Sequence, residues 1–364
     1  MPEPTAVAVL GAGHIGTVHV ESVHAMTGAH VRAVADQIAG NRERARECCG
    51  CATYADYEAL LAEEAIDVAV VALPPFLHAD AAIAAADHDC HVFVEKPLAP
   101  TSAAGERILD AARDAGVAVG VDHTLRYMPA MRELKRRYDD GAFGHVPICR
   151  ATRVNDGPFG SPPDGSEPSA WKLDPDATGG GALMDLGVHL FDVLRWFFGD
   201  VEVEHATFSR QLDVPYEDTA TVVTSTEAGT TATLDCGFFQ REDPEDVTLD
   251  VRLDGVAGTG RRADHAPDDQ IRHAAREAVG NVARHLTGRD PEPFTPTYYY
   301  RAHFEALRSF VRAVRVGEHP PVSGIDGLRA VELVEAAYDA GDGDWPHAPD
   351  PSTRERTPTR PRGE

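Results

Sequence analysis

The chain has 364 residues, which at about 150 residues per domain suggests two domains. It carries 34 basic and 59 acidic residues, a net charge of −25, so its surface repels nucleic-acid phosphates and anionic lipid, and neither is expected as a partner. No apolar run approaches the roughly 20 residues of a membrane-spanning helix, and no signal-peptide pattern is found. These two observations lead us to expect a soluble protein. Six cysteines in a chain of this length do not form a disulfide framework, which is consistent with residence in the reducing cytoplasm.

The basic residues are unusual in kind. Only Lys96, Lys135 and Lys172 are lysines, and the other 31 are arginines. An acidic excess with few lysines resembles the proteomes of halophilic archaea, whose acidic surfaces are screened by concentrated salt. A GC-rich genome that favours arginine codons is the alternative explanation. The composition therefore predicts a halophilic origin, which bears on habitat and not on activity.

Residues 5–122 alternate short apolar runs with helical stretches. The runs are rich in Val and Ala and apolar on both faces, as in strands of a buried parallel sheet: 6–10, 31–35, 67–73, 91–94 and 117–121. Helical patterns lie between them at 15–26, 42–49, 57–64, 79–87 and 103–115. The alternation predicts an α/β fold with a doubly wound parallel sheet.

After residue 123 the pattern changes. Helices are predicted at 129–138, 183–198, 270–287, 301–316 and 328–339, and alternating strands near 201–212, 217–227, 230–239 and 247–254. This indicates a largely antiparallel sheet that carries helices. We expect a dinucleotide-binding domain at 1–123, an α/β domain at 124–341 and a disordered tail at 342–364.

A glycine-rich loop follows the first run. Gly11, Gly13 and Gly16 form a GxGxxG pattern that opens the first helix, where glycines let the backbone approach a pyrophosphate. Asp36 follows 20 residues after Gly16 and is placed to accept from ribose hydroxyls, while its charge repels a 2′-phosphate. The loop predicts a Rossmann domain that binds NAD, and the nearby Arg42 and Arg44 leave NADP open as the alternative.

Two further segments carry groups suited to proton chemistry. Lys96, in Glu95-Lys96-Pro97, follows the run 91–94 at the edge of the sheet where doubly wound folds bind ligands. On the apolar helix 183–198, Asp185, His189 and Asp192 form one polar stripe, and buried polar groups need partners or a ligand. An imidazole beside a carboxylate is suited to act as a general base. A purely structural Asp–His pair is the alternative, and Asp192 is the member most suited to a structural role.

Taken together, these motifs resemble the Gfo/Idh/MocA oxidoreductases over about residues 5–340. The matching segments are the loop 11–16, Ala72-Leu73-Pro74-Pro75 with His78, Glu95-Lys96-Pro97, Asp122-His123 with Arg126-Tyr127, Trp171, the glycine-rich helix 179–199 and the segment 317–337. The resemblance implies a Rossmann domain followed by an α/β domain with an open, mostly antiparallel sheet. That sheet commonly forms the interface of a homodimer or homotetramer.

The resemblance also implies roles for individual residues. Lys96, Asp185 and His189 would be catalytic, and His123, Arg126, Tyr127, Asn155 and Trp171 would contact the substrate. The cofactor would be bound by Gly11, Ala12, Gly13, His14, Ile15, Gly16, Asp36, Leu73, Pro74, His78, Glu95 and Lys96. The expected activity is an NAD-dependent oxidation of a secondary hydroxyl of a sugar, sugar derivative or cyclitol. The alternatives are an NAD-dependent glycosidase and a non-catalytic dinucleotide-binding sensor.

No metal site is predicted. Cys48 and Cys51 have the CxxC spacing of zinc ligands, but no second ligand pair follows at a suitable distance. Cys90 with His88 and His91 leads into a strand, where turn and core roles are expected.

The composition yields one stability prediction. At a net charge of −25 the folded chain repels itself, and molar salt screens this repulsion. We expect the melting temperature to fall when molar KCl is replaced by dilute buffer, as measured by differential scanning fluorimetry at several salt concentrations. A melting temperature that does not depend on salt would contradict the halophilic interpretation.

Overall fold

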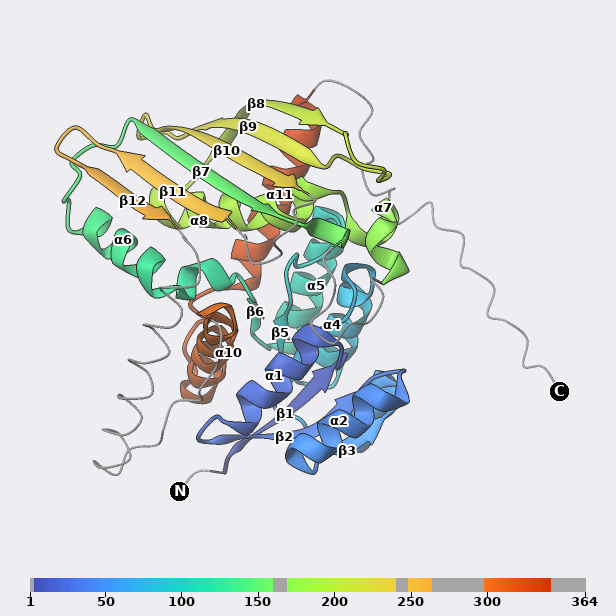
Figure 1. The fold of residues 1–364 in the computed structure, drawn as a ribbon. Coiled ribbons are helices and arrows are strands. Elements are labelled where there is room, and N and C mark those ends of the chain that lie inside the picture. Colours follow the sequence, from blue (N-terminus) through green and yellow to red (C-terminus); the bar gives the residue numbers. More distant parts are fainter. Residues whose placement is uncertain (1–2, 160–168, 240–247, 264–297, 342–364) are drawn as a thin grey trace.

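The computed structural model describes residues 3–159, 169–239, 248–263 and 298–341 (Figure 1). Each of the two halves of the chain builds a six-stranded sheet. The predicted helix 270–287 and the predicted tail 342–364 lie outside the described residues.

The first sheet is parallel throughout, with the strand order β3-β2-β1-β4-β5-β6. Its strands are β1 (Thr5–Leu10), β2 (Ala29–Ala35), β3 (Ala52–Tyr54), β4 (Val68–Val71), β5 (His91–Val94) and β6 (Val119–Val121). The connecting helices are α1 (His14–His24), α2 (Ala39–Cys49), α3 (Tyr57–Glu63), α4 (His78–Asp87) and α5 (Ser102–Ala115). This is the Rossmann order, and it confirms the predicted doubly wound sheet.

The second sheet has the order β12-β11-β7-β10-β9-β8, and only β7 and β10 pair in parallel. Its strands are β7 (Ile148–Asn155), β8 (Glu202–Ser209), β9 (Thr219–Ser225), β10 (Thr231–Phe238), β11 (Thr248–Asp254) and β12 (Thr259–Ala263). Buried and half-buried residues alternate along β9, as in a sheet with one face packed on the core. Because four of the five strand pairs are antiparallel, the predicted, mostly antiparallel sheet is confirmed.

Helices of the second half cover one face of this sheet (Figure 1). They are α6 (Pro129–Asp139) beside β12, α8 (Val188–Phe198) and α11 (Gly324–Ala340), while α7 (Pro175–Thr178) is one short turn. The predicted helix 183–198 begins as a π-helix, Leu183–Gly187, and continues as α8. Helix α10 (Tyr298–Val316) packs against α1, and α11 packs against α5 and β6, so the two halves share an interface.

The hydrophobic core is continuous between the halves. One cluster of buried side chains runs from Val7 and Phe93 of the first sheet through Phe310 of α10 to Leu190 of α8 and Leu234 of the second sheet. A second cluster fills the other face of the first sheet, beneath α3, α4 and α5. Because the shared cluster includes residues from both halves, their relative position is fixed by packing.

A buried ion pair also joins separate segments of the second half. Arg126, in the 3₁₀ turn Thr124–Tyr127, donates two hydrogen bonds of 2.8 and 2.6 Å to Asp192 of α8 and one of 3.1 Å to Asp326 of α11. Asp192 is 1% exposed, so its charge is stabilised almost wholly by this arginine. Burial opposes the charge of Arg126, but the two carboxylates outweigh it and raise the pKa of the guanidinium.

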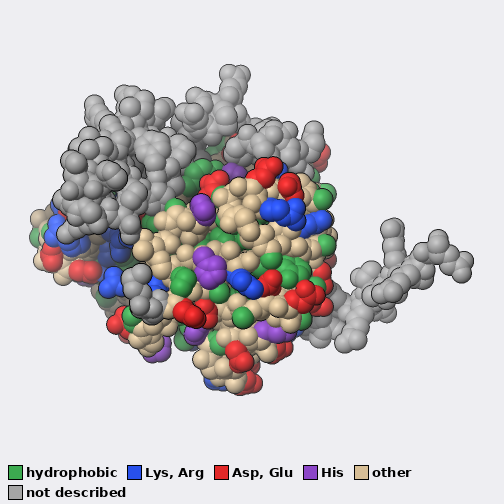
Figure 2. Space-filling view, turned by 90° about the horizontal axis from the view of Figure 1, so that it is seen from below, with side chains coloured by type: hydrophobic (Ala, Val, Ile, Leu, Met, Phe, Trp, Pro, Cys, Tyr) green, Lys and Arg blue, Asp and Glu red, His purple; other side chains and the backbone are tan. Residues whose placement is uncertain are grey.

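Exposed charges have a different arrangement. Figure 2 views the molecule from below Figure 1 and shows Asp and Glu side chains scattered among Lys and Arg over this face, with no large patch of either charge. Several of the exposed pairs join near neighbours along the chain, as Arg136 of α6 does with Glu133 of the same helix and with Asp140 directly after it. In the described part of the chain, no helix is long and apolar enough to cross a membrane.

Removing one partner of the buried pair leaves an uncompensated charge. We expect Asp192→Ala to lower the free energy of unfolding by about 3–5 kcal/mol, the usual cost of breaking a buried pair. Urea unfolding in molar KCl measures this loss. Arg136→Ala removes an exposed arginine that also bridges two carboxylates, and its unfolding midpoint should stay near that of the wild type. Equal midpoints for both variants would show that the buried pair does not hold these segments together.

Candidate functional site

The loop between β1 and α1 forms an open cradle. Gly11 has φ +93°, and a Cβ atom there would lie 2.5 Å from the carbonyl oxygen of Ala72, while a Cβ on Gly16 would lie 1.9 Å from the carbonyl of Gly11. At Gly13, by contrast, no atom lies within 4 Å of such a Cβ. Helix α1 begins here without a side-chain cap, so the loop leads directly into a helix N-terminus, the end of a helix that attracts anions. The loop therefore has the shape and polarity of a pyrophosphate cradle.

Asp36 closes one side of this cradle. Its carboxylate accepts hydrogen bonds from the backbone N–H of Ala12 (2.7 Å) and Ile38 (2.7 Å) and from Asn41 Nδ2 (3.0 Å). A carboxylate has about four acceptor positions, so one remains for a ribose hydroxyl. Arg42 instead donates to the carbonyl oxygens of Asp36 and Gln37, and Arg44 donates to Asn41. Both arginines therefore have partners other than a 2′-phosphate.

The segment after β4 lies beside the loop. Leu73 and Pro74 are half-buried, and the ring of His78 lies between the carbonyl oxygens of Leu73 and Pro97, at 2.8 Å from each. His78 is buried, so it links this segment to the one that follows β5.

Around the glycine loop itself, His14 Nε2 lies 2.8 Å from the hydroxyl of Tyr300, and Ile15 is half-buried. All these predicted cofactor residues lie at the carboxyl edge of the first sheet.

Lys96 and Asp185 meet across the two halves. The Nζ of Lys96, directly after β5, donates to Oδ1 of Asp185 at 2.5 Å and to its backbone carbonyl at 3.0 Å. The peptide bond between Lys96 and Pro97 is cis. Burial opposes ionisation of Asp185, but the charge and hydrogen bond of Lys96 outweigh it, and the pKa of the carboxyl is lowered. The structure thus places an ammonium–carboxylate pair where the two predicted catalytic segments meet.

His189 lies one turn further along, in α8. It is 1% exposed, and neither ring nitrogen has a hydrogen-bond partner among the described residues. Burial, and then the positive charges of Arg153 and Lys96, hold the pKa of His189 well below its ordinary value. The ring is therefore neutral at pH 7 and keeps a lone pair that can accept a proton.

His123 accompanies His189 in the same region. The two rings are in edge contact with centroids 5.8 Å apart, and His123 also has no hydrogen-bond partner among the described residues. Unpartnered buried imidazoles are costly in an apolar interior and are favourable where a polar ligand binds. The pair offers four ring nitrogens to such a ligand.

The other predicted substrate residues differ in their surroundings. Arg126 is occupied by Asp192 and Asp326, and Tyr127 is buried with its hydroxyl 2.7 Å from Ser309. Asn155 is half-buried at the end of β7 and accepts from the N–H of Gly157. Trp171, in the 3₁₀ turn Ala170–Leu173, is half-buried. Their contact with a substrate stays a prediction.

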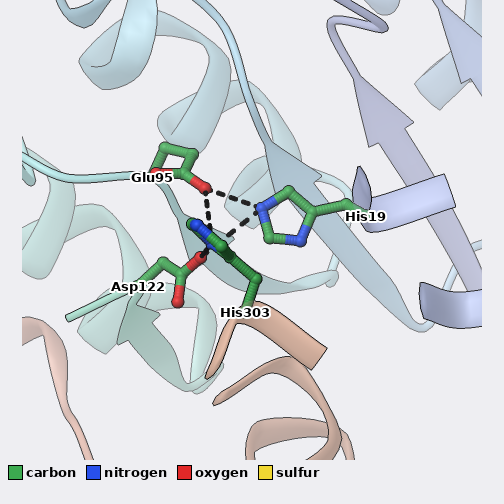
Figure 3. Close-up of side chains that lie close together, drawn as sticks. All are labelled: His19, Glu95, Asp122 and His303. Carbon is green, nitrogen blue, oxygen red and sulfur yellow. Dashed lines mark hydrogen bonds and ion pairs between the residues drawn. The ribbon is translucent and has the colours of Figure 1, made fainter. Parts of the chain in front are cut away.

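The sequence analysis missed one group of polar residues. His19 of α1, Glu95 after β5, Asp122 after β6 and His303 of α10 are all buried and point toward one another (Figure 3). His19 Nε2 lies 2.7 Å from Glu95 Oε1, and His303 Nδ1 lies 2.5 Å from Asp122 Oδ2. Burial, and then the neighbouring Glu95 carboxylate, raise the pKa of Asp122. Glu95 and Asp122 follow neighbouring strands, so their proximity could have been predicted from the strand order. His19 and His303 are 284 positions apart on different helices, and no pattern in the sequence connects them.

The cysteines that were considered as metal ligands lie elsewhere. Cys48 and Cys49 are half-buried at the end of α2, Cys51 is buried, and all three carry free thiols. Burial raises the pKa of Cys51 to about 12, so its thiol is protonated at pH 7.

Two parts of the chain match models of one protein family. Residues 5–123 match "Oxidoreductase family, NAD-binding Rossmann fold" of the Gfo/Idh/MocA group, and residues 131–259 match "GFO/IDH/MocA C-terminal domain". Together they include both sheets except for the last residues of β12.

Individual proteins agree with this assignment. The chain is 27% identical to myo-inositol 2-dehydrogenase of Thermotoga maritima, over 91% of this chain and 94% of that one. It is 29% identical to D-xylose 1-dehydrogenase (NADP(+)) 2 of Haloferax volcanii, over 79% of this chain and 82% of that one. The crystal structure of the WlbA dehydrogenase of Bordetella pertussis with NADH and UDP-GlcNAcA covers 93% of this chain and 96% of its own, with a TM-score of 0.77 and 22% identity, which shows a shared fold. The glycine loop, the domain matches and this common fold agree, and the chain belongs to the Gfo/Idh/MocA family of NAD-binding oxidoreductases.

Proposed function

We propose that this oxidoreductase transfers a hydride between a secondary hydroxyl of a sugar, sugar derivative or cyclitol and the nicotinamide of NAD. The observation that supports the proposal is the group of two buried imidazoles, His123 and His189, which have no hydrogen-bond partner among the described residues and lie near Lys96. Such a group suits a ligand rich in hydroxyls, because each hydroxyl both donates and accepts a hydrogen bond. Relatives named as dehydrogenases of apiose, xylose and inositol support this substrate class.

The cofactor fits the residues present. The loop 11–16 would hold the pyrophosphate over the N-terminus of α1, and Asp36 would accept from the adenosine ribose. Leu73 and Pro74 would border the cofactor beside Lys96, with His78 fixing their backbone. When bound, the nicotinamide supplies the two-electron acceptor for the carbinol carbon.

The proton chemistry belongs to the protein. His189 is neutral, so it would remove the hydroxyl proton as the carbonyl forms, and the ammonium of Lys96 would stabilise the developing negative charge on that oxygen. Asp185 holds Lys96 by two hydrogen bonds, and the ring of His189 has no hydrogen-bond partner among the described residues, so the role of Asp185 would be to position the lysine rather than the histidine.

The direct test is a screen of polyols, aldoses and nucleotide sugars with NAD⁺ in molar KCl, with NADH absorbance as the readout. Accumulation of NADH with one substrate class supports the proposal. Release of free sugar without net NADH would indicate the glycosidase, and binding of NAD without any turnover would indicate the sensor.

A preference for NAD over NADP is expected from Asp36. Repulsion of the 2′-phosphate and loss of the ribose hydrogen bond should favour NAD by about 1–3 kcal/mol, roughly 5- to 150-fold in kcat/KM. Asp36→Asn keeps an acceptor for the N–H of Ala12 but removes the negative charge. It should therefore bring kcat/KM for NADP closer to kcat/KM for NAD. Equal kcat/KM for the two cofactors in the wild type would refute the preference.

The catalytic roles can be separated by variants and pH. Lys96→Met and His189→Asn should each reduce kcat by about 10²–10⁴-fold while NAD binding, followed by fluorescence titration, is retained. Because the pKa of His189 is lowered, wild-type kcat should stay high below pH 6.5 and fall only where the ring gains a proton. That acidic limb should be absent in His189→Asn. If His189→Asn keeps near-normal kcat with the limb intact, another group is the base.

Several broader expectations remain predictions. Assembly of a homodimer or homotetramer through the second sheet is tested by light scattering in molar KCl. A halophilic origin is tested by the salt dependence of melting, and residence in the cytoplasm by cell fractionation.

A further inference from the structure

The cluster of His19, Glu95, Asp122 and His303 contains none of the residues assigned to proton transfer, and of the predicted cofactor residues it contains Glu95, whose carboxylate faces the two histidines. Each residue offers one ligand atom, and the four atoms lie within 4.8 Å of one another. The residues come from α1, from the ends of β5 and β6, and from α10, so the cluster joins four segments that are distant in the sequence (Figure 3). Within the described residues it is the one group with this combination of ligand types and spacing.

The spacing matches tetrahedral coordination. Zinc binds imidazole nitrogen and carboxylate oxygen at about 2.0–2.2 Å, which places neighbouring ligand atoms about 3.3 Å apart in a tetrahedron. The ligand atoms here are 2.7 Å (His19 to Glu95), 2.5 Å (His303 to Asp122), 3.6 Å (His19 to Asp122) and 3.6 Å (His303 to Glu95) apart. These distances lie on both sides of the tetrahedral value. For these four of the six pairs, a change of less than 1 Å gives the tetrahedral spacing, and the other two pairs, His19 with His303 and Glu95 with Asp122, lie within 4.8 Å.

The charges also match a dication. As metal ligands, two carboxylates and two neutral imidazoles carry a charge of −2 in total, and each of the four residues is at most 8% exposed. The nearest lysine, Lys96, directs its ammonium to Asp185. Two buried carboxylates side by side are costly unless a cation or a shared proton offsets them. A divalent ion would neutralise both.

We propose that His19, Glu95, Asp122 and His303 form a binding site for a divalent transition-metal ion, with Zn²⁺ as the ion that the ligand set fits best. Two imidazoles and two carboxylates are borderline donors suited to such an ion rather than to Mg²⁺ or Ca²⁺, which prefer oxygen ligands alone. The site provides four protein ligands and is closed to solvent, which is the pattern of structural rather than catalytic zinc.

The packing around the site supports a structural role. The ring of His19 is in edge contact with Phe93, with centroids 5.9 Å apart, so packing orients this ligand. His303 brings α10 against the carboxyl edge of the first sheet, and α10 also packs on α1. A bound ion would therefore fix α10 to the Rossmann half, directly beneath the segment that carries Lys96.

The test begins with the wild-type protein. After dialysis against a chelator and reconstitution, one equivalent of Zn²⁺ per chain should bind, as measured by plasma mass spectrometry, and should raise the melting temperature. Titration with Co²⁺ should give the intense visible bands of a tetrahedral site. Absence of binding near one equivalent, with no change in melting temperature, would show that protons alone hold the cluster together.

Variants place the ion. His303→Ala and His19→Ala should each weaken Zn²⁺ binding by more than the roughly 10- to 100-fold that loss of an outer-shell partner costs. Cys48→Ser/Cys51→Ser tests the one cysteine pair with zinc-like spacing, and His91→Ala removes an imidazole at the opposite end of β5. Both controls should keep full binding. Loss of the ion in the cysteine variant and its retention in His303→Ala would overturn the proposal.

If His303→Ala does not fold, Glu95→Gln decides the question, because it keeps the side-chain size and removes one charged ligand. The tetrahedral Co²⁺ spectrum should then change or disappear. An unchanged spectrum would exclude Glu95 and with it the site.

Discussion

Charged groups that lie within and between the two halves must have partners, and this constraint restricts how the segments that carry them pack together. Lys96 finds Asp185 across the interface, and Arg126 finds Asp192 and Asp326 on two different helices. Glu95 and Asp122, at the ends of neighbouring strands, find His19 and His303. Because an unpaired buried charge costs several kcal/mol, the pairs that are buried restrict the packing of the segments that carry them. The proposed site for chemistry lies where Lys96 meets Asp185.

The first sheet could be predicted well because its strands are buried on both faces and their apolar runs are continuous. The strand 91–94 is observed with the predicted bounds, whereas β3 was not predicted because it has three half-buried residues and no apolar run. In the second half, β12 was also not predicted, since its sequence Thr-Gly-Arg-Arg-Ala has no hydrophobic alternation. It exists because it pairs with β11 and packs against α6, and such long-range contacts leave no local pattern.

The candidate site shows a similar limit. The spacing of Asp185 and His189 suggested one polar stripe, which holds for a regular α-helix with i and i+4 on one face. The segment Leu183–Gly187, which contains Asp185, is instead a π-helix, so the i, i+4 alignment of a regular α-helix does not apply to it. Asp185 therefore faces Lys96, while His189 faces His123. Residue types and their segments were predictable, but the partner of each group depended on a local distortion of the helix.

Glu95 and Lys96 connect the two polar groups of the molecule. They are adjacent in sequence, and side chains of adjacent residues after a strand point in different directions. Glu95 is directed to the buried histidines and also accepts from the N–H of Lys96, while Lys96 is directed to Asp185. An ion or a proton that fixes the Glu95 carboxylate would therefore also fix the backbone that carries Lys96. Helix α10 supplies His303, which contacts Asp122 and lies 3.6 Å from Glu95. The C-terminal half therefore contacts the segment of Lys96 in two ways, through His303 beside Glu95 and through Asp185 beside Lys96. On the proposed function, the position of Lys96 consequently depends on a layer of buried polar groups to which no proton transfer is assigned.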